Sequence, residues 1–215
     1  MAQQPSEPVR LRALLTLAVT LAVLVAFGLG LQTALTPKPV ASLARCHPAQ
    51  QIGPHLYAGP PAMCIDTKRT YIAHIDTTKG RVDVVLDSAN SPVTVNNFVV
   101  LAISGFYNGL TFWHSEEWMV QGGDPNGDGT GGPGYTLPDE PLKNKSAWTS
   151  GSIGMARFLG GPVNGSQFFM LKSDWPGSGP GEVAFNRFGT VLGGTNLLTS
   201  ISAGDRIVNV SIGLQ

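Results

Sequence analysis

Residues 121–135 read QGGDPNGDGTGGPGY, and residues 164–169 read NGSQFF. The first block is a run of glycine interrupted by Asp, Asn and Pro, a composition typical of tight turns and of close backbone approaches. The second block is a short polar turn that leads into aromatic residues, which favours the start of a strand. The first block therefore predicts a long glycine-rich connection and the second the approach to a short strand, and the rest of the chain is interpreted around them.

The glycine-rich block also matches parts of two ligand-binding motifs. Residues 124–129 match the beginning of an EF-hand calcium loop, but the twelfth position is Tyr135 where a bidentate glutamate is needed. The glycines at 129, 131 and 134 fit the pattern G-x-G-x-x-G, yet the prolines at 133, 138 and 141 are incompatible with the helix that follows in a dinucleotide site. We therefore expect neither calcium nor a nucleotide here.

Segments with β-like composition surround the two blocks. Residues 71–76 and 82–86 flank the turn Thr78-Lys79-Gly80 and predict a β-hairpin. Ser91 and Pro92 predict the start of a helix that ends near Gly105. Further short strands are expected at 110–112, 118–121, 152–156, 167–171, 187–191 and 207–212, and a second short helix at 196–202.

The composition agrees with a fold of short strands and many turns. The chain has 27 glycines and 16 prolines among 215 residues, which argues against a helical bundle. We expect a mainly β fold, a closed eight-stranded antiparallel barrel capped by two helices. Basic and acidic residues balance at 14 each and the basic ones form no stripe, so we expect no nucleic-acid partner.

A long apolar segment precedes this domain. Residues 13–35 contain no charged side chain, and about 20 such positions suffice to cross a bilayer as a helix. Arg10 and Arg12 precede the segment and favour a cytoplasmic tail at residues 1–12, with the remainder outside the cytoplasm. We therefore expect a single-pass anchor in the cell membrane with an extracytoplasmic domain. The alternative is a cleaved signal peptide and a secreted protein, although the apolar region of a signal peptide is usually only about 7–15 residues long.

The segment after the anchor is rich in proline. Residues 36–67 are expected to form a stalk, with the folded domain at residues 68–215. Cys46 and Cys64 lie in this stalk and form a disulfide candidate in an oxidising compartment. A zinc site that adds His47 and His55 is a second interpretation, but it lacks the short paired spacing of structural zinc sites. Two unpaired thiols are the third, and we assign no metal.

The two opening blocks resemble the signature segments of the cyclophilins. The resemblance extends from about Tyr71 to Gln215, includes Phe188-Gly189-Thr190-Val191, and keeps the order of several independent segments. The lead-in at residues 60–66 is similar to that of bacterial, membrane-tethered members. The resemblance implies a peptidyl-prolyl cis-trans isomerase that assists the folding of extracytoplasmic proteins, with proline-containing polypeptides as partners and no cofactor. The sequence gives no indication of oligomeric state.

The resemblance also implies a set of site residues. The expected substrate-binding residues form an apolar cleft for the proline ring and hold the peptide backbone beside it: Phe112, Trp118, Met119, Ala156, Arg157, Gln167, Phe169, Trp175 and Phe185. His114 and Gln121 occupy the catalytic positions. Rotation about a peptide bond has a barrier of roughly 18–20 kcal/mol from amide resonance, so a catalyst needs donors that stabilise the twisted bond and requires no nucleophile or metal.

The chain departs from the family at the catalytic centre. Residues 112–114 read Phe-Trp-His where the family typically has Phe-His-Arg, so His114 occupies the position of the catalytic arginine. Loss of one well-placed donor typically costs about 10²–10³ in rate. Either a protonated His114 next to Glu116 or Glu117, or Arg157 reaching across the cleft, is a possible compensation. The alternative function is a non-catalytic module or chaperone that binds Xaa-Pro segments.

Overall fold

The computed structural model describes residues 41–141, 148–158, 160–177, 180 and 184–215. Contacts divide the chain into one unit at Met1–Lys38 and a second at Pro39–Gln215, which contains all of the described residues. The predicted cytoplasmic tail at 1–12 and the predicted anchor at 13–35 lie outside them. No helix within the described ranges is both long and apolar enough to cross a membrane.

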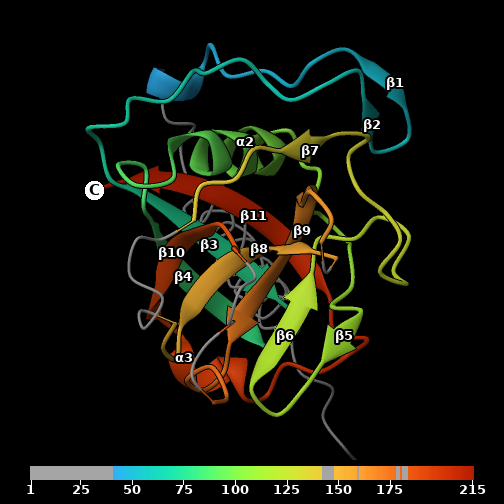
Figure 1. The fold of residues 1–215 in the computed structure, drawn as a ribbon. Coiled ribbons are helices and arrows are strands. Elements are labelled where there is room, and N and C mark those ends of the chain that lie inside the picture. The colour runs from blue at the N-terminus through green and yellow to red at the C-terminus, as the bar shows by residue number, and fades with distance from the viewer. Residues whose placement is uncertain (1–40, 142–147, 159, 178–179, 181–183) are drawn as a thin grey trace, which may run out of the picture. The chain divides into compact units, whose positions relative to one another are not determined.

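One antiparallel sheet forms the body of the second unit (Figure 1). Its strands follow the order β11-β3-β4-β10-β8-β9-β6-β5, and β7 pairs with β9 beside this path. Their bounds are β3 Tyr71–Thr77, β4 Gly80–Leu86, β5 His114–Ser115, β6 Met119–Gly122, β7 Thr136–Leu137, β8 Ser152–Arg157, β9 Val163–Leu171, β10 Arg187–Gly193 and β11 Ile207–Leu214. The mainly β prediction is therefore confirmed, and so is the predicted hairpin at 71–86.

The expected closed barrel is not what the structure contains. In the part of the chain that the structure describes, no ladder joins β5 to β11, so the sheet is a curled half-barrel with two edges. The segment before each edge strand still makes contact: Thr111 forms an isolated bridge with Arg206, and Phe112 N donates to Asp205 O at 2.8 Å. The strand predicted at 110–112 is this bridging segment, which is too short and irregular to extend the sheet.

Two α-helices cover opposite ends of the curled sheet, as Figure 1 shows. Helix α2 (Pro92–Ile103) begins after Ser91 with proline at its first position, as predicted, and α3 spans only Thr195–Leu198. The residues of α2 from Thr94 to Ala102 are all buried. The ring of Phe98 lies 5.0 Å from Tyr107, 5.8 Å from Phe168 and 5.1 Å from Phe188, so α2 anchors the aromatic centre of the core.

Residues 41–67, here called the N-terminal extension, pack against the domain instead of standing apart as a stalk. The extension contains a short 3₁₀ helix η1 (Ala41–Leu43) and a two-stranded hairpin of β1 (Gln51–Gly53) and β2 (Leu56–Tyr57). Its buried side chains belong to the main core, among them Leu43, Tyr57 and Ile65. The folded unit therefore begins before the expected boundary at residue 68.

A disulfide and a buried asparagine fix the extension to α2. Cys46 and Cys64 are bonded to each other, which confirms the disulfide candidate and removes these two residues from any zinc site or free-thiol role. On α2, Asn96 Oδ1 accepts from Cys64 N at 2.8 Å, and Asn96 Nδ2 donates to Ala62 O at 3.1 Å. Asn96 is almost fully buried, so its amide depends on the extension for these bonds.

Candidate functional site

The period-2 alternation of three neighbouring strands positions the site on the outer face of the sheet. Val120 in β6, Met155 in β8 and Phe168 in β9 belong to the main core. The residues next to them, Met119, Ala156 and Phe169, belong to a separate apolar cluster. Because successive strand residues point to opposite faces, the same strands supply both the core and this outer cluster.

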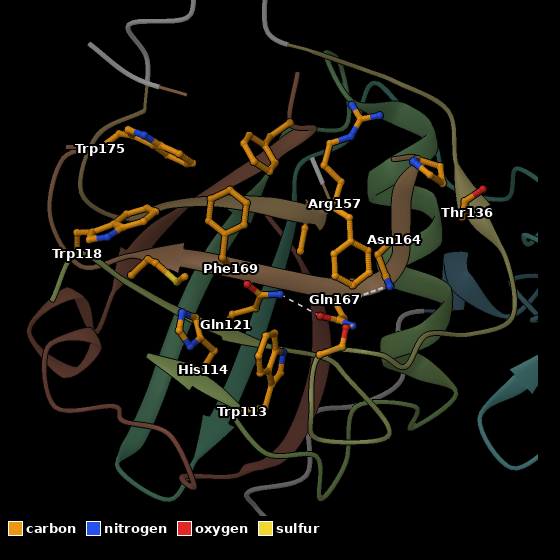
Figure 2. A pocket seen from close by; sticks show the side chains of 16 residues that line it. Trp113, His114, Trp118, Gln121, Thr136, Arg157, Asn164, Gln167, Phe169 and Trp175 are labelled. Carbon is orange, nitrogen blue, oxygen red and sulfur yellow. Dashed lines mark hydrogen bonds between the residues drawn. The ribbon is translucent and has the colours of Figure 1, made fainter. Parts of the chain in front are cut away.

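A cavity of 460 Å³ lies over this outer face (Figure 2). This volume falls within the range of about 300–1,000 Å³ that is typical of ligand pockets. Its described lining residues include every predicted site residue except Phe112, and they are Trp113, His114, Trp118, Met119, Gln121, Gly129, Thr136, Ala156, Arg157, Phe158, Pro162, Asn164, Gln167, Phe169, Trp175 and Phe185. The convergence of residues from several distant segments of the chain makes this cavity the candidate site.

The prediction that Phe112 contributes to the substrate-binding site was wrong. It is fully buried in the main core, where a Cβ built on Gly122 would lie only 2.9 Å from its Cδ1. The reason is a change of backbone partner: Phe112 N donates to Asp205 O, whereas the next residue, Trp113, donates its N to Gln121 O. The chain turns between these two residues, so Phe112 enters the interior and Trp113 lines the cavity.

Aromatic rings form one half of the cavity. The centroids of Trp118 and Trp175 are 4.8 Å apart, and Phe169 lies 5.8 Å from Trp175 and 5.3 Å from Phe185. Figure 2 shows Trp118, Trp175 and Phe169 along the same side of the cavity. Such a surface is well suited to an apolar ring, because aromatic faces supply a large contact area with little rotamer freedom to lose.

A tryptophan that the sequence did not suggest supports this aromatic half from behind. Trp148 is buried and stacks on Phe169, with centroids 5.5 Å apart and planes at 27°. Its backbone oxygen accepts a hydrogen bond from Trp175 N at 3.0 Å. The stack exists because Gly154 has no side chain: a Cβ there would lie 2.5 Å from Trp148 Cη2 and 2.8 Å from Phe169 Cζ.

Glutamine amides form a fixed polar chain on the opposite side. Gln121 Nε2 donates to Gln167 Oε1 at 2.9 Å, and Gln167 Nε2 donates to Gly129 O at 2.9 Å and to Gly131 O at 2.8 Å (Figure 2). Gln167 is buried, so these bonds lock its orientation. These hydrogen bonds leave Gln121 Oε1 as an acceptor beside the cavity, and they connect the glycine-rich block to β9.

His114 lies at the edge of the cavity, directly opposite Gln121 in the β5–β6 ladder. Its Nε2 is 3.1 Å from Glu116 Oε1, a contact that is an ion pair when the ring is protonated. The ring of Trp113 stacks on it at 5.3 Å and 29°. Lys172 binds the neighbouring residue of β5, since its Nζ donates to Ser115 Oγ at 2.7 Å. Partial burial lowers the pKa of this amino group.

Arg157 lines the cavity, but its guanidinium is bound elsewhere. Nε and Nη2 donate to Gly161 O at 2.9 and 2.6 Å, and Nη1 donates to Ala184 O at 2.5 Å and lies 2.9 Å from Asp139 Oδ1. Only 12% of the side chain is exposed. Figure 2 shows the guanidinium pointing away from Gln121. In this conformation Arg157 shapes the rim and does not reach the centre of the cavity, contrary to the compensation considered from the sequence.

Several lining residues were absent from the predicted set. They are Trp113, Gly129, Thr136, Phe158, Pro162 and Asn164. Gly129 and Asn164 belong to the two blocks quoted first, so their position beside the cavity had a signal in the sequence. Phe158, at 70% exposed, had none, because a single surface aromatic follows no pattern. Within the described ranges, no group of three or more His, Cys, Asp or Glu side chains is arranged to hold a metal.

The chain matches the family model described as cyclophilin type peptidyl-prolyl cis-trans isomerase/CLD over residues 72–212. It is 39% identical over 143 residues to a peptidyl-prolyl cis-trans isomerase of Helicobacter pylori, covering 66% of this chain and 86% of that protein. It is also 39% identical over 123 residues to peptidyl-prolyl cis-trans isomerase B of Bacillus subtilis, covering 57% of this chain and 83% of that protein.

Among solved structures, the fold is similar to a cyclophilin-type peptidyl-prolyl cis-trans isomerase of Cryptosporidium parvum, determined in the presence of the dipeptide Ala-Pro. The TM-score is 0.56 at 26% sequence identity, and the match covers 67% of this chain and 98% of the other. The family match begins at residue 72 and therefore does not include the N-terminal extension.

Proposed function

Because this chain belongs to the cyclophilin-type peptidyl-prolyl cis-trans isomerase family, we propose that its aromatic cavity binds the proline of Xaa-Pro segments and accelerates their isomerisation. The related structure from Cryptosporidium parvum was determined with Ala-Pro, which supports a proline-containing ligand for the same fold. The observation that carries the proposal is the convergence of Met119, Gln121, Gln167 and Phe169 on one cavity.

The cavity has two features that would favour this reaction, an apolar surface for the proline ring and fixed amides for the peptide backbone. In the transition state the peptide bond is twisted, conjugation is lost and the prolyl nitrogen carries a lone pair. Met119 and Phe169 would hold the pyrrolidine ring on the apolar side. The locked amides of Gln121 and Gln167 would fix the peptide backbone beside it, so that binding energy is available to favour the twisted geometry.

We further propose that His114 is the donor closest in role to the family's arginine, and that turnover is slow as a result. A neutral imidazole donates from one nitrogen only, whereas a guanidinium is permanently charged and has five N–H donors. In addition, His114 Nε2 lies 3.1 Å from Glu116 Oε1, so this ring nitrogen already faces a carboxylate.

The second candidate is a module that grips Xaa-Pro segments with little turnover. It is favoured by one observation: the arginine that lines the cavity, Arg157, has its guanidinium bound to Gly161 O, Ala184 O and Asp139. Both candidates require the same peptide-binding surface. They differ only in the rate at which the bound Xaa-Pro bond changes between cis and trans.

The experiment that tests the proposal measures cis–trans exchange of a short Xaa-Pro peptide by NMR, with the full-length chain in detergent solution. We expect faster exchange with the wild-type chain, and loss of peptide binding in Met119→Ala/Phe169→Ala. Leu192→Ala is the control, because Leu192 is exposed on β10 and does not line the cavity. Normal binding by the double variant would show that the cavity is the wrong site, and binding without faster exchange would favour the second candidate.

His114→Arg tests the account of slow turnover. The replacement restores a permanent charge opposite Gln121, and we expect the exchange rate to rise by about 10²-fold if the missing donor limits the reaction. Peptide affinity should change far less, since the aromatic half is untouched. An unchanged rate at unchanged affinity would mean that His114 is not the limiting residue.

We also propose that the domain acts on polypeptides outside the cytoplasm and is tethered there by residues 13–35. Support comes from the apolar length of that segment and from the Cys46–Cys64 disulfide, since disulfides persist mainly in oxidising compartments. Protease added to intact cells should degrade the domain while the chain remains in the membrane fraction. Recovery of a shortened chain in the medium would instead favour secretion after signal cleavage.

A further inference from the structure

A second hollow of 610 Å³ adjoins the aromatic cavity, and it is here called the hairpin groove. One wall is the turn of the β1–β2 hairpin, and the other is the glycine-rich block. Its described lining residues are Pro54, His55, Leu56, Pro125, Asn126, Thr130, Gly131, Gly132, Gly134, Tyr135, Thr136 and Asn164. Thr136 and Asn164 also line the aromatic cavity, so the two hollows share an edge.

The hairpin wall is held firmly against the glycine-rich block. Tyr57 N donates to Pro133 O at 2.9 Å. The ring of His55 meets Phe106 edge-on at 5.0 Å, and Tyr57 is buried in the main core. The Cys46–Cys64 disulfide joins the chain on either side of the hairpin, so the extension presents a preformed surface, which avoids much of the entropy cost that a mobile loop pays on binding.

Apart from His55, the groups that line the groove are uncharged. None of its described residues is Asp, Glu, Lys or Arg. Burial raises the pKa of the Tyr135 phenol, which stays neutral and donates to Asn97 Oδ1 at 2.7 Å. The other groups are the imidazole of His55, two asparagine amides, two threonine hydroxyls, the backbone of Gly132 and Gly134, and the apolar side chains of Pro54, Leu56 and Pro125. Amides and backbone groups recognise a peptide main chain, and the absence of charge disfavours an ionic side chain.

We propose that the hairpin groove is a second peptide subsite, which binds uncharged residues of the same polypeptide whose proline occupies the aromatic cavity. The inference rests on the proposed function, because its occupant is the continuation of that substrate. Because the two hollows share an edge at Thr136 and Asn164, a polypeptide bound in the aromatic cavity can continue into the hairpin groove. The N-terminal extension would then select substrates by the sequence beside the proline.

The test compares peptides of different length on the full-length chain in detergent solution. A four-residue peptide with a central Xaa-Pro bond is compared with peptides that carry six further uncharged residues on one side of the proline or on the other. Six extended residues span about 20 Å, enough to leave the first cavity. We expect one of the two long peptides to bind about tenfold more tightly than the short one, as measured by calorimetry.

Two variants on the same hairpin separate the groove from general surface effects. Leu56 lines the groove and is 41% exposed, whereas Ile52 is 64% exposed and does not line it. Leu56→Asp should abolish the gain of the long peptide while leaving binding of the short peptide unchanged, and Ile52→Asp should preserve both. Unchanged binding of the short peptide also shows that each variant is folded.

The outcomes distinguish this subsite from the proposed function. If the short peptide binds and neither extension improves affinity, or if the gain survives in Leu56→Asp, the hairpin groove is not a subsite although the aromatic cavity still is. If neither the short nor the long peptides bind, both proposals are overturned.

Discussion

Replacing Gly154 with alanine adds one methyl group against Trp148 and Phe169, and tests whether the missing side chain at this position allows the two rings to stack. The added Cβ would lie 2.5 Å from Trp148 Cη2 and 2.8 Å from Phe169 Cζ. Carbon atoms prefer separations of about 3.5–4.0 Å, so the two rings must move apart by about 1 Å or the strand must shift. Because Gly154 and Phe169 are cross-strand partners, the backbone offers little room for such a shift.

Overpacking of this kind typically costs about 1–3 kcal/mol of stability. We expect the free energy of unfolding of Gly154→Ala to fall by that amount, measured by chemical denaturation. We also expect weaker binding of an Xaa-Pro peptide, by about tenfold if opening the stack costs about 1.4 kcal/mol of contact with the proline. Tryptophan fluorescence should change as well, since Trp148 is one of the two rings displaced.

Gly59→Ala is the matched control. A Cβ on Gly59 would have no atom within 4 Å, and its backbone is outside the left-handed region. If Gly154→Ala equals this control in stability, fluorescence and peptide affinity, then Trp148 and Phe169 are not held by the glycine, and the supporting role assigned to Trp148 is wrong.

Three further changes test the attachments of the domain. Cys46→Ser/Cys64→Ser should lower the free energy of unfolding by about 3 kcal/mol, given a separation of 18 residues between the cysteines. Calorimetry of the wild-type chain with and without reductant, and of the variant, measures this loss. An unchanged free energy of unfolding would mean that packing alone holds the extension. Asn96→Ala should cost about 1–3 kcal/mol because it leaves Cys64 N without its acceptor, and hydrogen exchange at that amide should rise while exchange in β3 does not. Glu140→Ala removes the acceptor for Val93 N and Thr94 N at the start of α2 and should cost about 1–2 kcal/mol in urea titration, whereas Glu140→Gln should recover part of that loss.

Local patterns were sufficient to predict the elements whose sequence carries its own signal. The hairpin at 71–86 has alternating burial on both strands, and the α2 helix has proline at its first position and a glycine soon after its end. The two opening blocks led to the cavity because Gln121, Gln167 and Phe169 lie within or beside them. These features depend on residues that are close together in the sequence, so one sequence is enough to predict them.

The elements that sequence reasoning missed depend on distant partners. The proline-rich segment at 41–67 has no periodicity of its own. Its position depends on contacts with Asn96 and Phe106, which lie beyond the boundary expected at residue 68. Trp148 follows no strand or helix pattern, and its position depends on the lack of a side chain at Gly154. Phe112 was misplaced because the backbone changes partner immediately after it, from Asp205 to Gln121.

The alternation in β6, β8 and β9 has a consequence for how this protein can vary in length. One added or deleted residue inside any of these strands would exchange its two faces, sending cavity side chains such as Phe169 into the interior and interior ones such as Phe168 outward. Both the fold and the ligand surface would be damaged at once. Changes in chain length are therefore expected to accumulate in the connections between these strands, where they reshape the rim of the cavity and leave its floor unchanged.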